Sequence, residues 1–362
     1  MIRVLAASAV LWMAVPAPGQ PMIGKPADLL ASYEPVERDR WRAVRITGPE
    51  QWKRKRADIR TRVLDVMGPL PAGDAPLAPE IGNRTDEGSY TRIKVVYRGA
   101  AGGPIPAWLL VPKTPGPHAA VLAAHPTNES GKDSVVGLDA KPHQVYGKEL
   151  AERGFVVLAP DSITAGERVL AGSKPYVTER FDAANPGWSA MGKMLSDHMR
   201  GIDFLVGRPE VRRDAIGVIG HSLGGYNAFF LAAFDERIRA AVSSCGFTPL
   251  GGGSRPFAWA RDSWFVHFPR LAPYLRAGIA PFDFHEVMAM AAPRALYNYS
   301  AAADATFPDI GAIRSAAAQV KEVYGVLGAR ERFVYQDGPG PHNFPETVRQ
   351  ETYRWLRAEL GR

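Results

Sequence analysis

A serine between two glycines is the residue of this sequence best suited to covalent chemistry. Gly220, Ser222 and Gly224 form a Gly-x-Ser-x-Gly pattern, which the apolar run 216–219 precedes and the apolar helical segment 223–234 follows. A nucleophile elbow requires this strand, turn and helix, because its serine sits on a tight turn that exposes the hydroxyl. Side chains two positions away would clash there, so glycine is expected on both sides. We expect Ser222 to be a nucleophile; the alternative is a buried serine in a glycine-rich turn.

A serine hydroxyl needs a base that accepts its proton, and histidine is the usual one. The sequence contains eight histidines. His342 lies in a loop between the predicted last strand, 332–335, and the predicted last helix, 345–360. The chain order serine, acid, histidine is the order that folds with this elbow use. His342 is therefore the predicted base, with a structural loop histidine as the alternative. His221, inside the elbow, is expected to pack or to cap.

A third residue must orient the imidazole and stabilise its charged form. Asp304 is the predicted acid, because it lies in the loop that follows the predicted strand 295–299. Asp309 is the second candidate, since it lies deeper in the same loop and could instead cap the helix that follows. Asp337 is a weaker candidate, because it stands only five residues before His342.

Two N–H donors are expected to bind the oxyanion of an acyl-transfer intermediate. One is the backbone N–H of Leu223, directly after the nucleophile. The other should come from the loop after the predicted strand 119–124, where Thr127 is chosen because Pro126 has no N–H. His125, at the end of the same strand, is predicted to contact substrate, and a core-facing position is the equal alternative.

Short apolar runs alternate with helical segments from residue 91 onward, which indicates an α/β fold. Strands separated by helices predict a mostly parallel sheet covered on both faces. With two antiparallel strands at the front, we expect an eight-stranded sheet. The predicted strands are 93–97, 107–111, 119–124, 155–159, 216–219, 240–244, 295–299 and 332–335, and the predicted helices between and after them are 143–153, 190–206, 223–234, 313–327 and 345–360.

The chain divides into three predicted parts. Residues 1–19 read as an export signal, with an apolar stretch at 4–15 that is too short to span a bilayer. Residues 20–89 form an N-terminal arm with an amphipathic helix at 51–67, and residues 90–362 form the catalytic domain. We therefore expect an exported protein, periplasmic or extracellular, with no stable membrane insertion.

An aromatic stretch, approximately 246–285, interrupts the alternation of strands and helices. Long irregular segments in compact domains are usually functional. Because this one falls between the sixth and seventh predicted strands, we expect a lid over the nucleophile. Its aromatic residues fit no single helix face, so about half are expected to pack the lid down. Trp259 and Trp264 are predicted to bind substrate, since flat aromatic faces suit sugar rings.

Composition excludes several other classes of protein. The chain has 362 residues with 44 basic and 37 acidic side chains, and ten of the basic ones lie between residues 38 and 62. This local excess favours a solvated helix face, and no nucleic-acid partner is expected. The single cysteine, Cys245, excludes an internal disulfide and cysteine-based metal sites. His285 and Glu286 lack the second histidine of a zinc helix, so no metal and no cofactor are expected.

Together these motifs resemble bacterial serine hydrolases of the dienelactone hydrolase and acetyl xylan esterase-like group, in the α/β-hydrolase superfamily. The resemblance covers roughly residues 90 to 360. It implies carboxylic-ester hydrolysis without a metal, often on sugar esters. Dienelactone hydrolases proper carry a cysteine where this chain has Ser222, so a dienelactone substrate is not expected. The motifs are His125-Pro126-Thr127, Leu158-Ala159-Pro160-Asp161, Gly166-Glu167-Arg168, the elbow 220–225, Asp304, and Gly340-Pro341-His342-Asn343-Phe344.

The sequence therefore predicts a serine ester hydrolase that acts through an acyl-enzyme on short-acyl esters of carbohydrates or related small esters. One alternative is a serine peptidase or amidase, since prolyl-peptidase catalytic domains also resemble this chain. A second is a catalytically silent binding protein on the same scaffold. A salt bridge between Asp161 and Arg168 is expected to brace the loop after the fourth predicted strand. The sequence does not specify the oligomeric state.

Overall fold

The computed structural model describes residues 27–37, 40–139 and 141–361. Within these residues, a central sheet of nine strands has the order β11-β10-β9-β8-β6-β7-β5-β4-β3. The six strands β6 to β11 run parallel, and β3, β4 and β5 are antiparallel to their neighbours. The strands are β3 (Glu80–Asp86), β4 (Tyr90–Arg98), β5 (Pro104–Pro112), β6 (His118–Ala124), β7 (Val156–Pro160), β8 (Val211–His221), β9 (Ile238–Ser244), β10 (Ala295–Ala301) and β11 (Phe333–Gly338).

The predicted mostly parallel α/β sheet is confirmed, but the count of eight strands is wrong. The additional strand is β3, which pairs with β4 at the edge of the sheet. Every side chain of β3 is exposed, so its sequence carries no buried alternation by which a strand could be recognised. The sheet also begins at Glu80, before the predicted start of the catalytic domain at residue 90.

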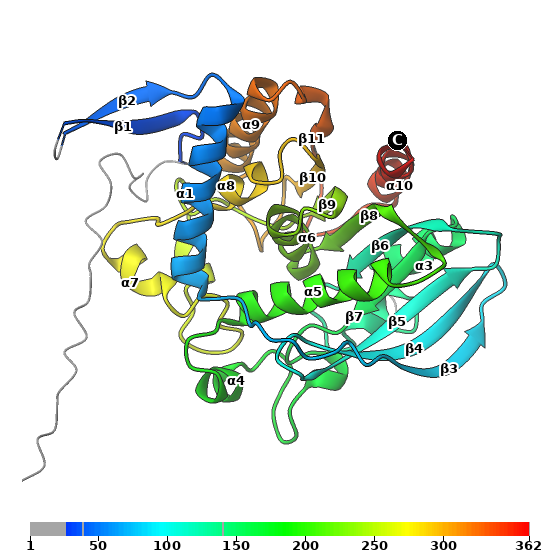
Figure 1. Cartoon of the computed structure of the whole chain (residues 1–362). Coiled ribbons are helices and arrows are strands. Elements are labelled where there is room, and N and C mark those ends of the chain that lie inside the picture. The colour runs from blue at the N-terminus through cyan, green and yellow to red at the C-terminus, as the bar shows by residue number, and fades with distance from the viewer. Residues whose placement is uncertain (1–26, 38–39, 140, 362) are drawn as a thin grey trace, which may run out of the picture.

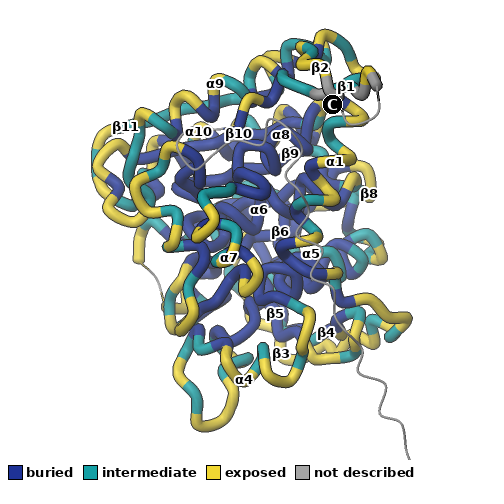
Figure 2. Tube along the Cα trace, turned by 90° about the vertical axis from the view of Figure 1, so that its left-hand side faces the viewer, coloured by how far each residue is buried: buried dark blue, intermediate teal, exposed yellow. Residues whose placement is uncertain are grey.

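Helices cover both faces of the sheet and form one core on each side (Figure 1). On one face α5, α6 and α9 pack with α1 and α8, and on the other α3 and α10 pack against the strands. Figure 2 shows the central strands and α6 as the most buried part. The helices are α1 (Pro49–Met67), α2 (Lys132–Val135), α3 (Tyr146–Glu152), α4 (Glu179–Ala184), α5 (Ala190–Val206), α6 (Leu223–Phe234), α7 (Leu271–Arg276), α8 (Phe284–Ala289), α9 (Ile310–Val326) and α10 (Glu346–Leu360), with 3-10 turns η1 (Gly166–Arg168), η2 (Pro256–Trp259) and η3 (Arg330–Arg332).

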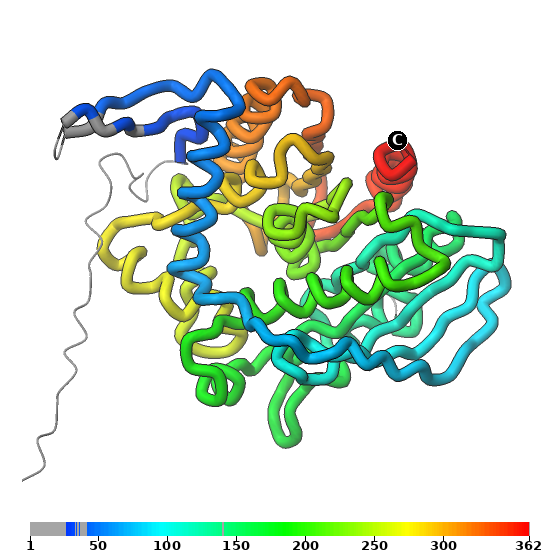
Figure 3. Tube along the Cα trace, in the orientation of Figure 1, coloured from blue at the N-terminus to red at the C-terminus, as the bar shows by residue number. Residues whose placement is uncertain are grey.

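The N-terminal arm contains a hairpin that the sequence did not predict, β1 (Ala31–Glu37) and β2 (Arg40–Arg45). It lies beside α9, far away in the sequence (Figure 3), and the Leu29 N–H donates to the Gln319 side chain at 2.9 Å. Helix α1 then packs against α8, where Arg62 forms a salt bridge of 2.9 Å with the buried Glu286. Arg62 therefore helps to hold α1 against α8. The sequence analysis had instead predicted a solvated basic face.

The aromatic segment 246–285 leaves the carboxyl end of β9 and returns at α8. Its two ends are tied together, because the Asp283 carboxylate accepts the backbone N–H groups of Leu250 and Gly251, both at 2.9 Å. Asp283 also caps α8 in a capping box with Glu286. These bonds hold the segment over the carboxyl edge of the sheet, where the elbow lies. That the segment acts as a lid stays a prediction.

The predicted export signal, residues 1–19, lies outside the described residues. Among the described residues, no helix is both long enough and apolar enough to cross a membrane.

Candidate active site

Ser222 stands on the predicted elbow, between the end of β8 and the start of α6. Its backbone adopts φ 57° and ψ −119°, a strained conformation for a residue with a side chain. A Cβ on Gly220 would lie 2.1 Å from the carbonyl oxygen of Gly224, and one on Gly224 would lie 2.0 Å from that of Ala124. The two glycines are therefore steric requirements of the turn. The turn is also held by the Ser222 N–H, which donates to the Ser244 carbonyl at 2.8 Å.

His342 and Asp304 meet at the carboxyl edge of the sheet. The Nδ1 atom of His342 lies 2.7 Å from Oδ2 of Asp304. The other carboxylate oxygen of Asp304 accepts the backbone N–H groups of Thr306 at 2.7 Å and Phe307 at 2.9 Å. Because a carboxylate can only accept, the proton of this pair lies on Nδ1 and leaves Nε2 of His342 free to act as a base. The loops also join directly, since the Ala303 N–H donates to the Gly340 carbonyl at 2.9 Å.

The other two candidate acids have different partners. The carboxylate of Asp309 accepts the backbone N–H and the hydroxyl of Ser254, both at 2.8 Å. Asp337 forms a bidentate ion pair with Arg314, at 2.7 and 3.1 Å. The geometry thus pairs His342 with Asp304 and leaves the alternatives in separate contacts.

Ser222 and His342 line one hollow of about 280 Å³, which we call the Ser222 hollow. Predicted residues Thr127, Trp259 and Trp264 also line it. Trp259 is buried and stacks on Phe307, with ring centroids 5.6 Å apart, whereas Trp264 is exposed. Most of the predicted site residues are therefore gathered around one space beside the serine.

Comparisons with known proteins relate this chain to hydrolases. Residues 105–256 match the dienelactone hydrolase family. Its fold is that of the α/β-hydrolases. The chain is 26% identical to a protein of Bacillus subtilis (strain 168) named as a hydrolase, YtaP, over 84% of this chain and 100% of that protein. The comparisons support the predicted class of enzyme, an ester hydrolase.

Solved structures of esterases share this fold. A glucuronoyl esterase from Solibacter usitatus superposes with a TM-score of 0.71 at 20% identity, covering 94% of this chain and 98% of its own. A protein of Bacteroides fragilis NCTC 9343 described as an acetyl xylan esterase gives a TM-score of 0.63 at 18% identity, covering 89% and 84%.

Leu223 and Thr127, the predicted oxyanion donors, both lie near Ser222. Leu223 is the first residue of α6, directly after the serine, and Thr127 lines the Ser222 hollow. The loop that carries Thr127 is held by Tyr176, whose hydroxyl donates to the Asn128 carbonyl at 2.7 Å and accepts the Asn128 N–H at 2.9 Å. That Leu223 and Thr127 bind the oxyanion stays a prediction.

His125 is not placed as a substrate ligand. Its Nδ1 atom lies 2.8 Å from the Pro126 carbonyl, and its Nε2 atom accepts the Ser162 N–H at 3.0 Å. Both ring nitrogens are used inside the protein, and burial lowers the pKa of the ring. Among the described residues that line the Ser222 hollow, His125 is absent. The core-facing alternative is the correct one, because the ring joins the ends of β6 and β7.

The expected salt bridge between Asp161 and Arg168 is also wrong. Arg168 pairs with the buried Asp197 at 2.8 Å and reaches only the backbone carbonyl of Asp161. The partner of the Asp161 carboxylate is Lys132, whose Nζ lies 2.8 Å from Oδ2, with both side chains at most 1% exposed. This buried pair joins the loops after β6 and β7, and Thr127 belongs to the first of these loops.

Replacing Lys132 with alanine is expected to lower the free energy of unfolding by about 3–5 kcal/mol, because it leaves the Asp161 carboxylate buried without its cation. Urea unfolding followed by tryptophan fluorescence measures this change. Lys94→Ala is the matched control. Lys94 pairs with Glu167, which also pairs with Lys132 but is more exposed than Asp161. Removing the Lys94 side chain should therefore lower the free energy of unfolding by about 1 kcal/mol or less. Equal unfolding curves for the two variants would contradict the proposed brace.

His221 packs, as expected, behind the base. Its Nδ1 atom lies 3.1 Å from the Ser244 hydroxyl, and its ring lies beside that of His342, with centroids 4.8 Å apart and the planes tilted by 37°. Burial, followed by the charge of His342, holds the pKa of His221 well below its usual value. A neutral His221 therefore supports the His342 ring without repelling its protonated form.

Cys245 is the third residue beside the His342–Asp304 pair. One ligand atom each of Cys245, Asp304 and His342 lies within 4.8 Å of the others, the single such group among the described residues. Burial raises the pKa of the thiol to about 12, and its sulfur donates to the Asn343 carbonyl at 3.4 Å. A metal bound here would have to displace the bond between His342 and Asp304, so insensitivity to chelators stays a prediction of the metal-free mechanism.

Several lining residues of the Ser222 hollow were missed by the sequence analysis. Tyr226 and His267 are hydrogen-bonded to each other inside the hollow, and Arg255 and Arg261 also line it. Tyr226 could have been found, because it follows Ser222 by four residues on α6 and so shares its helix face. The other three lie on the irregular segment 246–285, whose path no local pattern specifies.

Proposed function

We propose that this protein is an exported esterase that cleaves short-acyl esters, of acetyl type, on carbohydrates or related small alcohols. The observation that carries this proposal is the single hollow that Ser222 and His342 share, with Asp304 bonded to the far nitrogen of the histidine. A nucleophile, a base of fixed tautomer and an orienting acid are the parts that acyl transfer requires.

The reaction follows from this arrangement. Nε2 of His342 takes the Ser222 proton while the serine oxygen attacks the ester carbonyl, and the Leu223 and Thr127 N–H groups stabilise the oxyanion. His342 then gives its proton to the departing alcohol, which leaves an acyl group on Ser222. Water, activated by the same nitrogen, attacks this acyl-enzyme and releases the acid.

The walls of the Ser222 hollow favour a short acyl group and a polar alcohol. Beside aromatic rings such as Trp259 and Phe265, they present the hydroxyls of Thr248 and Thr306 and the guanidinium of Arg255. A long alkyl chain would strip water from these polar groups without returning hydrogen bonds. Sugar hydroxyls can bond to them while a ring packs on the aromatic faces.

Nitrophenyl esters of graded acyl length test this proposal. Acetyl esters are expected to be cleaved faster than esters of eight or more carbons, by about 10-fold or more in kcat/KM. Acetylated sugars should be substrates, whereas aminoacyl amides should not, and this comparison separates the esterase from a peptidase or amidase. Faster cleavage of long-chain esters, or of the amides, would refute the proposed substrate.

A further inference from the structure

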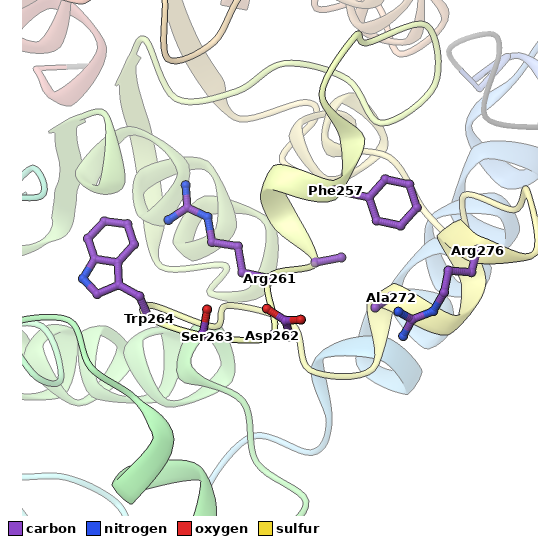
Figure 4. A pocket seen from close by; sticks show the side chains of 8 residues that line it. Phe257, Arg261, Asp262, Ser263, Trp264, Ala272 and Arg276 are labelled. Atoms are coloured by element: carbon purple, nitrogen blue, oxygen red, sulfur yellow. The ribbon is translucent and has the colours of Figure 1, made fainter.

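A second, larger hollow lies between η2, the residues that follow it and helix α7. It has a volume of about 560 Å³, and we call it the outer hollow. In the view of Figure 4, Phe257 and Arg276 stand on one side of it and Trp264 and Arg261 on the other. Asp262 and Ser263 also line it. A space of this size, beside a smaller one that contains the serine, exceeds what a small ester needs.

Arg261 and Trp264 line both hollows. The Arg261 guanidinium lies over the Trp264 ring, 4.9 Å from its centroid. His267 lines the Ser222 hollow, and its pKa is lowered to about 3 by burial and, second, by the charge of Arg261. The Arg261 cation therefore acts on groups inside the Ser222 hollow. The pair therefore forms a shared wall, and a ligand that fills one hollow contacts the same two side chains as a ligand that fills the other.

Three arginines in this region have no carboxylate partner among the described residues. Arg255 lines the Ser222 hollow, Arg276 the outer hollow and Arg261 both, and the salt bridges of the described chain include none of them. The one acid in the two linings is Asp262. Guanidinium groups that have no carboxylate partner within the protein can bind carboxylates of a ligand by paired hydrogen bonds.

The outer hollow also exposes two large aromatic side chains. Phe257 is 49% and Trp264 44% exposed, although most aromatic residues of the segment 246–285 are buried. The Trp264 backbone is fixed by its N–H, which donates to Glu179 at 3.1 Å, and its ring meets Tyr176 edge-on at 6.4 Å. Exposed aromatic faces in a recess, next to cations, are typical of a binding surface.

We propose that the two hollows form one cleft for an acidic oligosaccharide: the ester lies at Ser222, sugar rings pack on Trp264 and Phe257, and uronate carboxylates pair with Arg261 and Arg276. This inference rests on the proposed esterase function for the position of the ester. It adds the substrate class, a chain of sugars with negative charge. An acidic chain satisfies the free cations, which a neutral sugar leaves without a counter-charge.

A pair of matched substrates tests the inference: an acetylated oligosaccharide that contains uronate, and the same compound after its carboxyl groups are reduced to alcohols. The acidic compound is expected to have a KM about 3–10-fold lower, and this advantage should shrink at high salt, since partly exposed charges are screened. Arg276→Ala should remove most of the advantage and raise KM for the acidic compound more than KM for nitrophenyl acetate. Arg354→Ala, an exposed arginine on α10, is the control and should change neither.

Direct binding separates this inference from the proposed function. Calorimetric titration of Ser222→Ala with the deacetylated acidic oligosaccharide should show binding that weakens with salt and in the Arg276→Ala background. Equal KM for the acidic and reduced compounds, or equal binding of both, would overturn the acidic cleft even if nitrophenyl acetate is cleaved normally. Binding of the acidic compound by a protein that cleaves no ester would instead keep the cleft and overturn the esterase proposal.

Discussion

Replacing Ser222 with alanine is expected to lower kcat for nitrophenyl acetate by about 10⁴-fold or more. The expectation follows from the elbow: Ser222 is the serine that shares a hollow with His342, and its strained backbone presents the side chain there. Without its oxygen no acyl-enzyme can form. Because the substitution removes a single atom, circular dichroism and the unfolding midpoint should stay close to those of the wild type.

A fluorophosphonate probe gives an independent measurement of the same residue, since it labels activated serines. Labelling should be lost in Ser222→Ala and kept in Ser173→Ala, which removes a hydroxyl from an exposed loop. Wild-type protein that resists the probe would favour the silent binding protein. A Ser222→Ala variant that keeps both labelling and turnover would move the nucleophile to another serine.

The central strands and long helices could be predicted because their signals are local. Strands β6 and β7 are buried along most or all of their length and read as continuous apolar runs. Helix α5 has the predicted bounds, Ala190–Val206, because its apolar residues recur at helical spacing, and in the structure the Ser189 side chain caps its first turn. Strand β3 lacks such a signal because its side chains face solvent. The edge of the sheet was therefore missed while its centre was recognised.

The site shows the same division between local and distant determinants. Ser222, Asp304 and His342 were placed by short motifs and by their order along the chain. The role of His125 depends on the N–H of Ser162, 37 positions away in the chain, and no motif encodes that contact. For a similar reason, Asp161 pairs with Lys132 and Arg168 pairs with Asp197, in place of the predicted pair of Asp161 and Arg168. Burial decides which charges must be paired. Contacts that tertiary packing creates require the structure.

Replacing Asp304 with asparagine is expected to lower kcat by about 10³–10⁴-fold, because the substitution reverses the tautomer of His342. One carboxylate oxygen of Asp304 accepts the N–H groups of Thr306 and Phe307, so the amide oxygen of asparagine will take that position. The amide NH₂ group then faces Nδ1 of His342, which must become an acceptor. The ring proton moves to Nε2, where it blocks transfer from Ser222.

Asp309→Asn is the matched control for this prediction. Asp309 lies in the same loop, but its carboxylate bonds Ser254 and not the histidine, so kcat should fall by less than about 10-fold. The two variants are compared by kcat on nitrophenyl acetate, with fluorophosphonate labelling rates as a second readout of serine activation. A larger loss in Asp309→Asn than in Asp304→Asn would transfer the acid to Asp309. If both variants lose little activity, His342 must keep its tautomer without a carboxylate beside it. The side chain of Asp304 would then contribute only packing to the loop.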